Sequence, residues 1–226
     1  MTRPQSLPDL VTDLSLPYRL YPTNGTPQGL ILLLHGVGSN ETSLAGLVPH
    51  LPEDHSIALV RSPYPMGPNA FRAFAVNFTP QGPTIDKAEA EASRLTLTRF
   101  VGELQQRIGV APEHTLIAGF SQGGIMSAGL ALTQPELVAG FAILSGRILP
   151  EIEPLIPAQE KLRHLKALIL HGEADGTLPV TWADRSAELL KAHQVPFSLH
   201  KFQARHEITG EMVGAFVEWV KDCAEA

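Results

Sequence analysis

The chain has 226 residues, of which 44% are hydrophobic and 18% are charged, and its formal net charge is −6 at pH 7. This composition is typical of a compact globular protein and excludes intrinsic disorder. The acidic balance and the lack of a Lys/Arg cluster argue against nucleic acid as a partner. The length predicts one α/β domain over residues 1–226, with residues 1–16 as an N-terminal extension.

We expect neither a targeting segment nor a membrane span in this sequence. Its first ten residues lack the continuous apolar run of a signal peptide, and no later run reaches the roughly 20 apolar residues that span a bilayer. We therefore expect a cytoplasmic protein with no membrane span. The single cysteine, Cys223, fits a reducing compartment, and its position near the end of a helix predicts packing and no functional role.

Short apolar runs alternate along the chain with longer segments of helical period. This pattern predicts a mostly parallel sheet of about seven strands with helices on both faces. In chain order, the predicted strands are Tyr18–Tyr21, Leu30–His35, Ser56–Val60, Thr115–Phe120, Val138–Leu144, Ala167–His171 and Phe197–Phe202. The clearest helix is Asp86–Ile108, where Asp86 followed by Glu89 indicates the helix start. A last helix carries a core-facing stripe of Met212, Phe216, Trp219 and Cys223.

Two segments, Arg61–Pro83 and Leu149–Pro157, are rich in proline and are predicted to be irregular. Loops at the carboxyl edge of an α/β sheet form its binding crevice, so both are candidate walls of a substrate pocket. The first segment carries apolar side chains suited to an acyl pocket, namely Met66, Phe71, Phe74 and Phe78. Ordinary packing of a long loop against the body is an equally good interpretation.

The stretch Gly119-Phe-Ser-Gln-Gly123 places a serine between a predicted strand and a run of helix formers. A nucleophilic serine needs an exposed hydroxyl on a strained turn, and small flanking residues leave room for that turn. The following helix directs its N-terminal N–H groups at the same spot, so the Gln122 N–H is predicted as one oxyanion donor. Because a bare G-x-S-x-G match is common by chance, the prediction of Ser121 as nucleophile depends on its partners.

A serine hydroxyl needs a base, and the order serine, acid, histidine is typical of hydrolases of this type. Among nine histidines, His206 follows the last strand and precedes the last helix, which makes it the predicted base. The acid should follow the strand Ala167–His171, where Asp175 and Glu173 compete. We favour Asp175, which lies deeper in the turn.

The second oxyanion donor should come from the loop after an early strand. The segment His35-Gly-Val-Gly38 follows the strand Leu30–His35, and its glycines let the backbone approach closely. The Val37 N–H is therefore the predicted donor. His35 is expected to hold this loop by side-chain hydrogen bonds.

Together these stretches resemble the phospholipase/carboxylesterase group of the α/β-hydrolase superfamily, which includes acyl-protein thioesterases and small bacterial esterases. The resemblance covers roughly residues 17 to 222, and the matching stretches are His35–Gly38, Gly119–Gly124 with Met126-Ser127, Leu144–Gly146, His171-Gly-x-x-Asp175-x-x-Leu178-Pro179 and His206. It implies an α/β-hydrolase fold, Ser121, Asp175 and His206 as a catalytic triad, and Val37 and Gln122 as backbone oxyanion donors. It also makes a homodimer plausible.

The chain departs from that family at two places. It has Phe71-Arg-Ala-Phe74 where members often carry a Trp-Phe pair, and Arg205 where a glycine often precedes the catalytic histidine. These differences put the identity of the substrate in doubt and leave the chemistry alone. The safer inference is a carboxylic ester of modest size.

We therefore expect a serine carboxylesterase that acts on small to medium acyl esters, with thioesters and lysophospholipids left open, through an acyl-enzyme and without a cofactor or metal. One alternative is a hydrolase-fold module that binds a ligand without turning it over. Another is an enzyme like the dienelactone hydrolases, which normally carry cysteine where Ser121 stands. A third is a metal-assisted hydrolase using His35, His171 and Asp175, although the chain has no H-E-x-x-H motif.

Overall fold

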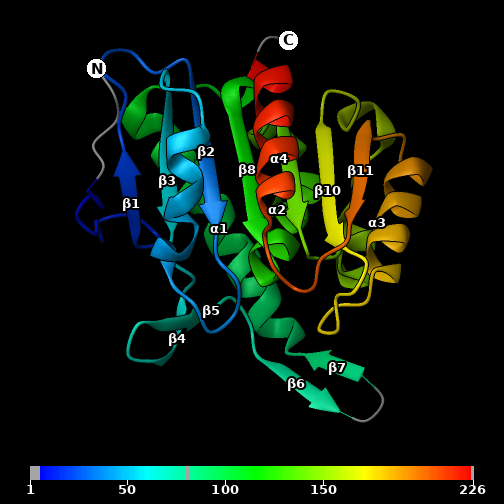
Figure 1. Ribbon diagram of the computed structural model, residues 1–226. Helices are drawn as coiled ribbons and strands as arrows, with labels where there is room; N and C mark the ends of the chain where they lie inside the picture. The colour runs from blue at the N-terminus through cyan, green and yellow to red at the C-terminus, as the bar shows by residue number, and fades with distance from the viewer. Residues whose placement is uncertain (1–5, 80–81, 225–226) are drawn as a thin grey trace.

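The computed structural model describes residues 6–79 and 82–224 (Figure 1). Its central sheet consists of β1 (Tyr18–Tyr21), β2 (Gly29–Leu34), β3 (His55–Val60), β8 (Thr115–Phe120), β9 (Gly140–Leu144), β10 (Lys166–Gly172) and β11 (Phe197–Phe202). The strands lie in the order β1-β3-β2-β8-β9-β10-β11. β1 pairs antiparallel with β3, and the other neighbours pair in parallel. The predicted mostly parallel sheet of about seven strands is confirmed, with some strand ends shifted by one or two residues.

Helices connect the strands. The α-helices are α1 (Lys87–Ile108), α2 (Gln122–Thr133), α3 (Thr181–Ala192) and α4 (Gly210–Ala224). Short 3-10 segments are η1 (Glu41–His50), η2 (Pro112–His114), η3 (Pro135–Leu137), η4 (Pro150–Leu155) and η5 (Gln159–Lys161). The predicted start of α1 is confirmed, because the Asp86 carboxylate accepts a hydrogen bond of 3.0 Å from the Glu89 N–H.

Successive side chains of a strand point to opposite faces of the sheet, so the protein has one hydrophobic core on each face. In β2, Leu30 and Leu32 pack against the side that α1, α2 and α3 cover, whereas Ile31 and Leu33 pack against η1 and α4. Figure 1 shows α4 in front of the sheet and α1 and α2 behind it. Because both faces are covered, every residue of β2 is buried, which explains why it reads as a continuous apolar run.

The prediction that Arg61–Pro83 is irregular is wrong. This segment contains two antiparallel hairpins below the sheet in Figure 1, β4 (Tyr64–Gly67) with β5 (Ala70–Arg72) and β6 (Val76–Thr79) with β7 (Gly82–Ile85). Proline is tolerated in edge strands, and both strands of a two-stranded ribbon are edges. Its prolines therefore did not signal a loop. The second proline-rich segment, Leu149–Pro157, contains the single 3-10 segment η4.

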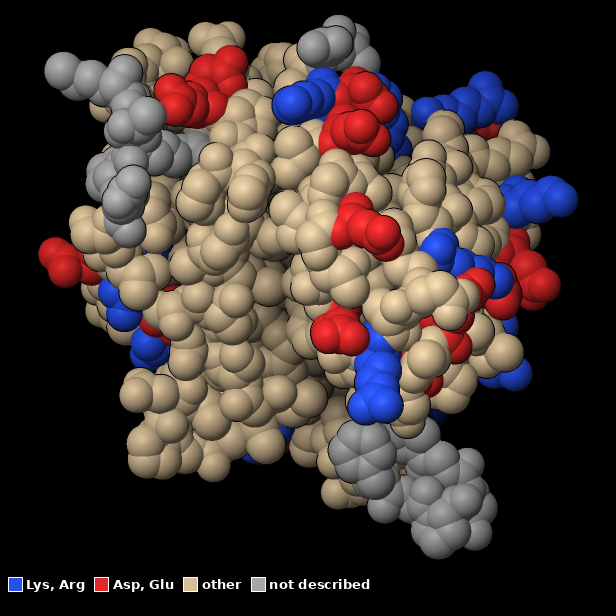
Figure 2. Space-filling model, in the orientation of Figure 1, with Lys and Arg blue, Asp and Glu red and all other residues tan. Residues whose placement is uncertain are grey.

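The surface carries charges of both signs. On the face shown in Figure 2, Lys and Arg side chains are scattered among Asp and Glu, and a broad area carries neither. Over residues 6–79 and 82–224, no helix combines the length and the apolar character that crossing a bilayer requires.

Candidate active site

Ser121 lies at the turn between β8 and α2, at the carboxyl edge of the sheet. Its φ of 52° and ψ of −116° form a backbone conformation that side-chain-bearing residues rarely adopt. The turn is held by hydrogen bonds from the Ser121 N–H to Leu144 O at 2.8 Å and from the Ile125 N–H to Ser121 O at 3.1 Å. The predicted strand, turn and helix are confirmed.

Gly119 and Gly123 flank the turn because no larger residue fits there. A Cβ atom on Gly119 would overlap the carbonyl of Gly123, and one on Gly123 would overlap the carbonyl of Leu34 at the end of β2. These obstacles are backbone atoms of the sheet and of the first turn of α2, which cannot move aside as a flexible side chain would. The two glycines thus allow α2 to pack directly on β8 and β2.

The loop after β11 brings His206 to Ser121. Its Nε2 lies 2.9 Å from Ser121 Oγ, and its Nδ1 lies 2.6 Å from Asp175 Oδ2. The imidazole ring packs against Phe120, with the ring centroids 4.9 Å apart. The Asp175 side chain is fully buried, whereas that of His206 is 19% exposed. Three side chains from distant parts of the chain therefore form one hydrogen-bonded row.

The two carboxylates that competed for the role of acid are placed differently. Oδ1 of Asp175 accepts hydrogen bonds of 2.8 Å from the Thr177 and Leu178 N–H groups, which leaves Oδ2 for His206. Glu173 is exposed and accepts a hydrogen bond from Gln203. The row at Ser121 therefore includes Asp175 and not Glu173.

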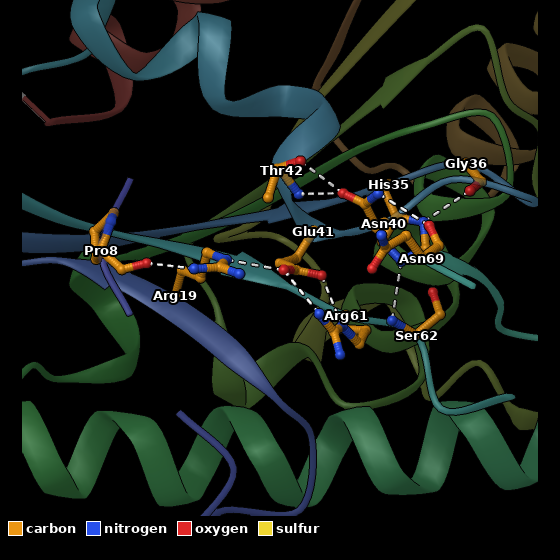
Figure 3. A network of polar contacts seen from close by, with 10 residues as sticks. All are labelled: Pro8, Arg19, His35, Gly36, Asn40, Glu41, Thr42, Arg61, Ser62 and Asn69. Atoms are coloured by element: carbon orange, nitrogen blue, oxygen red, sulfur yellow. Dashed lines mark hydrogen bonds and ion pairs between the residues drawn. The ribbon is translucent and has the colours of Figure 1, made fainter. Parts of the chain in front are cut away.

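The loop after β2 is held by His35, as expected (Figure 3). The His35 Nδ1 donates to Gly36 O at 2.7 Å, and its Nε2 accepts from the Ser62 N–H at 3.0 Å. Burial lowers the pKa of His35, which favours the neutral ring that can donate from one nitrogen and accept at the other. A protonated ring would lose the acceptor that holds the Ser62 N–H.

A buried carboxylate behind this loop was missed by the sequence analysis. Glu41 is 2% exposed and accepts hydrogen bonds from Arg19 at 2.8 Å and from Arg61 at 2.7 and 2.9 Å (Figure 3). Burial by itself raises the pKa of Glu41, but the hydrogen bonds from Arg61 and Arg19 outweigh it and lower the pKa to about 2. The Arg61 guanidinium also lies 4.4 Å from the Phe71 ring centroid, and the Gly38 N–H donates to Phe71 O at 2.9 Å. The network therefore ties β5 to the loop.

A cavity of about 50 Å³ opens at Ser121. Its wall is mostly apolar and includes Phe74, Val76, Ile85, Ile125 and Leu178. Val37 and Gln122, the two predicted oxyanion donors, also belong to the wall. Within the described part of the chain, neither of their backbone N–H groups donates to a backbone carbonyl in a turn, loop or cap. Val37 and Gln122 therefore stay the candidate oxyanion donors.

Of the four residues predicted to bind substrate, only one is found in the described part of the cavity wall. Phe74 lines the cavity, with its backbone carbonyl held by the Gln122 side chain at 2.9 Å. Met66 is 52% exposed on β4 and Phe71 packs under Arg61, so neither belongs to the cavity wall. The Phe78 side chain falls outside the described part of the structure.

One charged residue of the cavity wall, Arg147, was also missed. It directly follows Leu144–Gly146, one of the stretches that carry the family resemblance, and no periodicity marks it. Of the three residues of the metal alternative, His171 and Asp175 lie together, with His171 Nε2 3.4 Å from Asp175 Oδ2. Both nitrogens of His35 instead bind the backbone. Among the described residues, no group of three or more His, Cys, Asp and Glu side chains is placed to hold a metal ion.

The family model of phospholipases and carboxylesterases matches residues 20–224. The chain is 32% identical over 111 residues to acyl-protein thioesterase 1 of Gibberella zeae, an alignment that covers 47% of each chain. It is 33% identical over 132 residues to the esterase YpfH of Escherichia coli, covering 55% of each chain. The aligned stretch thus spans about half the length of each of these two relatives.

The fold has close structural neighbours. The crystal structure of a carboxylesterase from Mesorhizobium loti matches with a TM-score of 0.82 and 24% identity, covering 98% of this chain and 99% of that one. This likeness confirms the predicted hydrolase fold, and the family match confirms the predicted resemblance to phospholipases and carboxylesterases. The chain belongs to the phospholipase/carboxylesterase family of α/β hydrolases.

Proposed function

We propose that the protein hydrolyses small to medium carboxylic esters through an acyl-enzyme, with Ser121 as nucleophile, His206 as base and Asp175 as the acid that orients the base. The observation that carries this proposal is the row of hydrogen bonds of 2.9 Å from His206 to Ser121 and 2.6 Å from His206 to Asp175. A base within hydrogen-bond reach of a hydroxyl, itself oriented by a third group, is the arrangement that activates serine.

In the first half of the reaction, Ser121 Oγ attacks the ester carbonyl carbon while its proton passes to His206 Nε2. The carbonyl oxygen becomes an oxyanion, which the N–H groups of Val37 and Gln122 stabilise. The carbon–oxygen bond to the alcohol then breaks, and the leaving oxygen takes the proton from Nε2. In the second half, water gives a proton to His206 Nε2 as it attacks the acyl carbon. The bond between that carbon and Ser121 Oγ then breaks, the acid is released, and Nε2 returns the proton to Oγ.

The cavity at Ser121 supports short acyl groups as substrates, since it measures about 50 Å³. A larger groove of about 430 Å³ begins beside it, because Ile85 and Ile125 line both spaces. Its wall also includes Met126 and Leu149, which are apolar. A medium acyl chain would continue from the cavity into this groove. Thioesters and lysophospholipids fall within the same chemistry.

The experiment that tests the proposal is labelling with a fluorophosphonate probe, together with turnover of p-nitrophenyl butyrate. We expect one label, at Ser121, and loss of both labelling and turnover in Ser121→Ala. Ser145→Ala is the matched control, because Ser145 is a buried serine at positive φ after the neighbouring strand β9. Full turnover by Ser121→Ala would refute the proposal. A wild type that resists the probe, while a small acyl ligand still raises its Tm, would favour the non-catalytic binding module.

The single domain, the cytoplasmic location and the homodimer stay predictions. Size-exclusion chromatography with light scattering would distinguish a monomer of 24.4 kDa from a dimer.

A further inference from the structure

Arg147 lies at the carboxyl edge of the sheet. It follows β9, which lies between β8, the strand that leads to Ser121, and β10, the strand that leads to Asp175. Its side chain belongs to the wall of the cavity at Ser121, and the residue is 8% exposed. A buried arginine thus lines the same cavity as the proposed nucleophile.

This guanidinium has no polar partner among the described residues. Its Nε is fully buried without a hydrogen bond. Glu151 is near enough to act on it electrostatically but is paired with Lys87 at 3.1 Å. The other buried arginine of the described residues, Arg94, instead donates to Glu91 at 2.7 and 2.8 Å and to Thr133 at 2.8 Å. Leaving a buried donor such as this Nε of Arg147 unpaired costs free energy, so the position of Arg147 calls for an explanation.

Stacking explains only part of this arrangement. The Arg147 guanidinium lies 4.2 Å from the ring centroid of Trp182, which holds it in place. A ring face accepts no in-plane N–H bond, so the donors around the guanidinium edge stay open. Burial lowers the pKa of Arg147, and the charge of Arg185 acts in the same direction. The guanidinium keeps its charge even so, because its pKa starts far above neutrality.

We propose, on the basis of the esterase function above, that Arg147 is a specificity-determining residue that binds a carboxylate of the substrate. The preferred substrates are then esters that carry a second, ionised carboxyl group a few bonds from the scissile carbonyl. A planar guanidinium matches a carboxylate with two parallel hydrogen bonds. No Asp or Glu of the described residues lines the cavity to compete for it. The small volume of the cavity favours a short spacing between the two carbonyl groups.

Two matched pairs of esters test this inference and show which side of the ester carries the anion. In the acyl pair, monoethyl succinate is compared with ethyl isocaproate, in which an isopropyl group replaces the carboxylate. In the alcohol pair, butyrylglycolate is compared with isobutyl butyrate, which makes the same exchange. The quantity measured is the ratio of kcat/KM within each pair, for the wild type, Arg147→Met and Arg185→Met.

Arg185→Met is the matched control, because Arg185 also stacks on Trp182, at 4.7 Å, but is exposed and does not line the cavity. We expect the wild type to prefer the anionic ester in one pair, and Arg147→Met to reduce that preference roughly 10- to 100-fold. Arg185→Met should keep the preference. A purely structural Arg147 would lower the Tm without changing the ratio.

A wild type without preference in either pair, or an equal loss in both variants, would overturn the inference. If Arg147→Met does not fold, Arg147→Lys replaces it. This change keeps the charge but removes the planar guanidinium that forms two parallel hydrogen bonds. An unchanged kcat/KM ratio in Arg147→Lys would also overturn the inference. The esterase proposal is judged separately, by Ser121-dependent turnover of uncharged p-nitrophenyl butyrate. Calorimetry of succinate binding to Ser121→Ala, with and without Arg147→Met, gives a readout that needs no turnover.

Discussion

The proposed role of Asp175 can be tested by exchanging one oxygen for an NH₂ group, in Asp175→Asn. The Thr177 and Leu178 N–H groups both donate to Oδ1, so the amide oxygen must stay there. The NH₂ group then occupies the place of Oδ2 and faces His206 Nδ1. Because NH₂ donates, Nδ1 must accept, and the ring proton moves to Nε2. That nitrogen can no longer take the proton of Ser121.

We expect this wrong tautomer to lower kcat by about four orders of magnitude, or about 5 kcal/mol of transition-state stabilisation. The assay is kcat/KM for p-nitrophenyl butyrate, with the rate of fluorophosphonate labelling as a second measure. Glu173→Gln is the matched control, and we expect it to stay within roughly twofold of wild type because Glu173 is exposed and its carboxylate accepts a hydrogen bond from Gln203, outside the row at Ser121. Asp175→Asn with more than about a tenth of the wild-type activity would refute this reasoning.

Two further predictions concern stability. Gly123→Ala should lower the Tm by roughly 10 °C or more, since the new methyl group would overlap the Leu34 carbonyl. Glu41→Gln should destabilise the protein by about 3 kcal/mol at neutral pH, because the pKa of Glu41 falls from 4.5 to about 2 on folding. The wild type holds this contribution fully above about pH 4.5 and loses it as the pH falls towards 2, so chemical denaturation should show the two proteins converging in acid.

Each of these two stability variants has a matched control. Gly214→Ala adds the same methyl group in α4, where nothing lies within 4 Å, and should leave the Tm unchanged or higher. Equal Tm values for the two alanine variants would contradict the proposed packing of the turn. Glu188→Gln removes an exposed charge from α3 and should have little effect at any pH. A Glu41→Gln difference that stays constant from neutral pH to pH 2 would show that hydrogen bonding to the ionised carboxylate is not its source.

Much of the site was predictable because local patterns mark it. An apolar run that ends at Ser121 between two glycines implies a strand, a tight turn and a helix, and each of these elements is present. The sequence predicted His206 and Asp175 as partners of Ser121 for a related reason. The carboxyl ends of parallel strands meet at one edge of the sheet, so residues that follow such strands converge whatever their separation in the chain.

What the sequence by itself determined is therefore the sheet, its edge and the residue types delivered there, because strand period and glycine placement are local properties of the chain. Only the tertiary structure shows that Asp175, and not Glu173, is the turn carboxylate buried against His206. It alone revealed the Glu41 network and the unpaired Arg147. Pairing and burial of a charge depend on neighbours from distant segments, and no spacing along the chain records them.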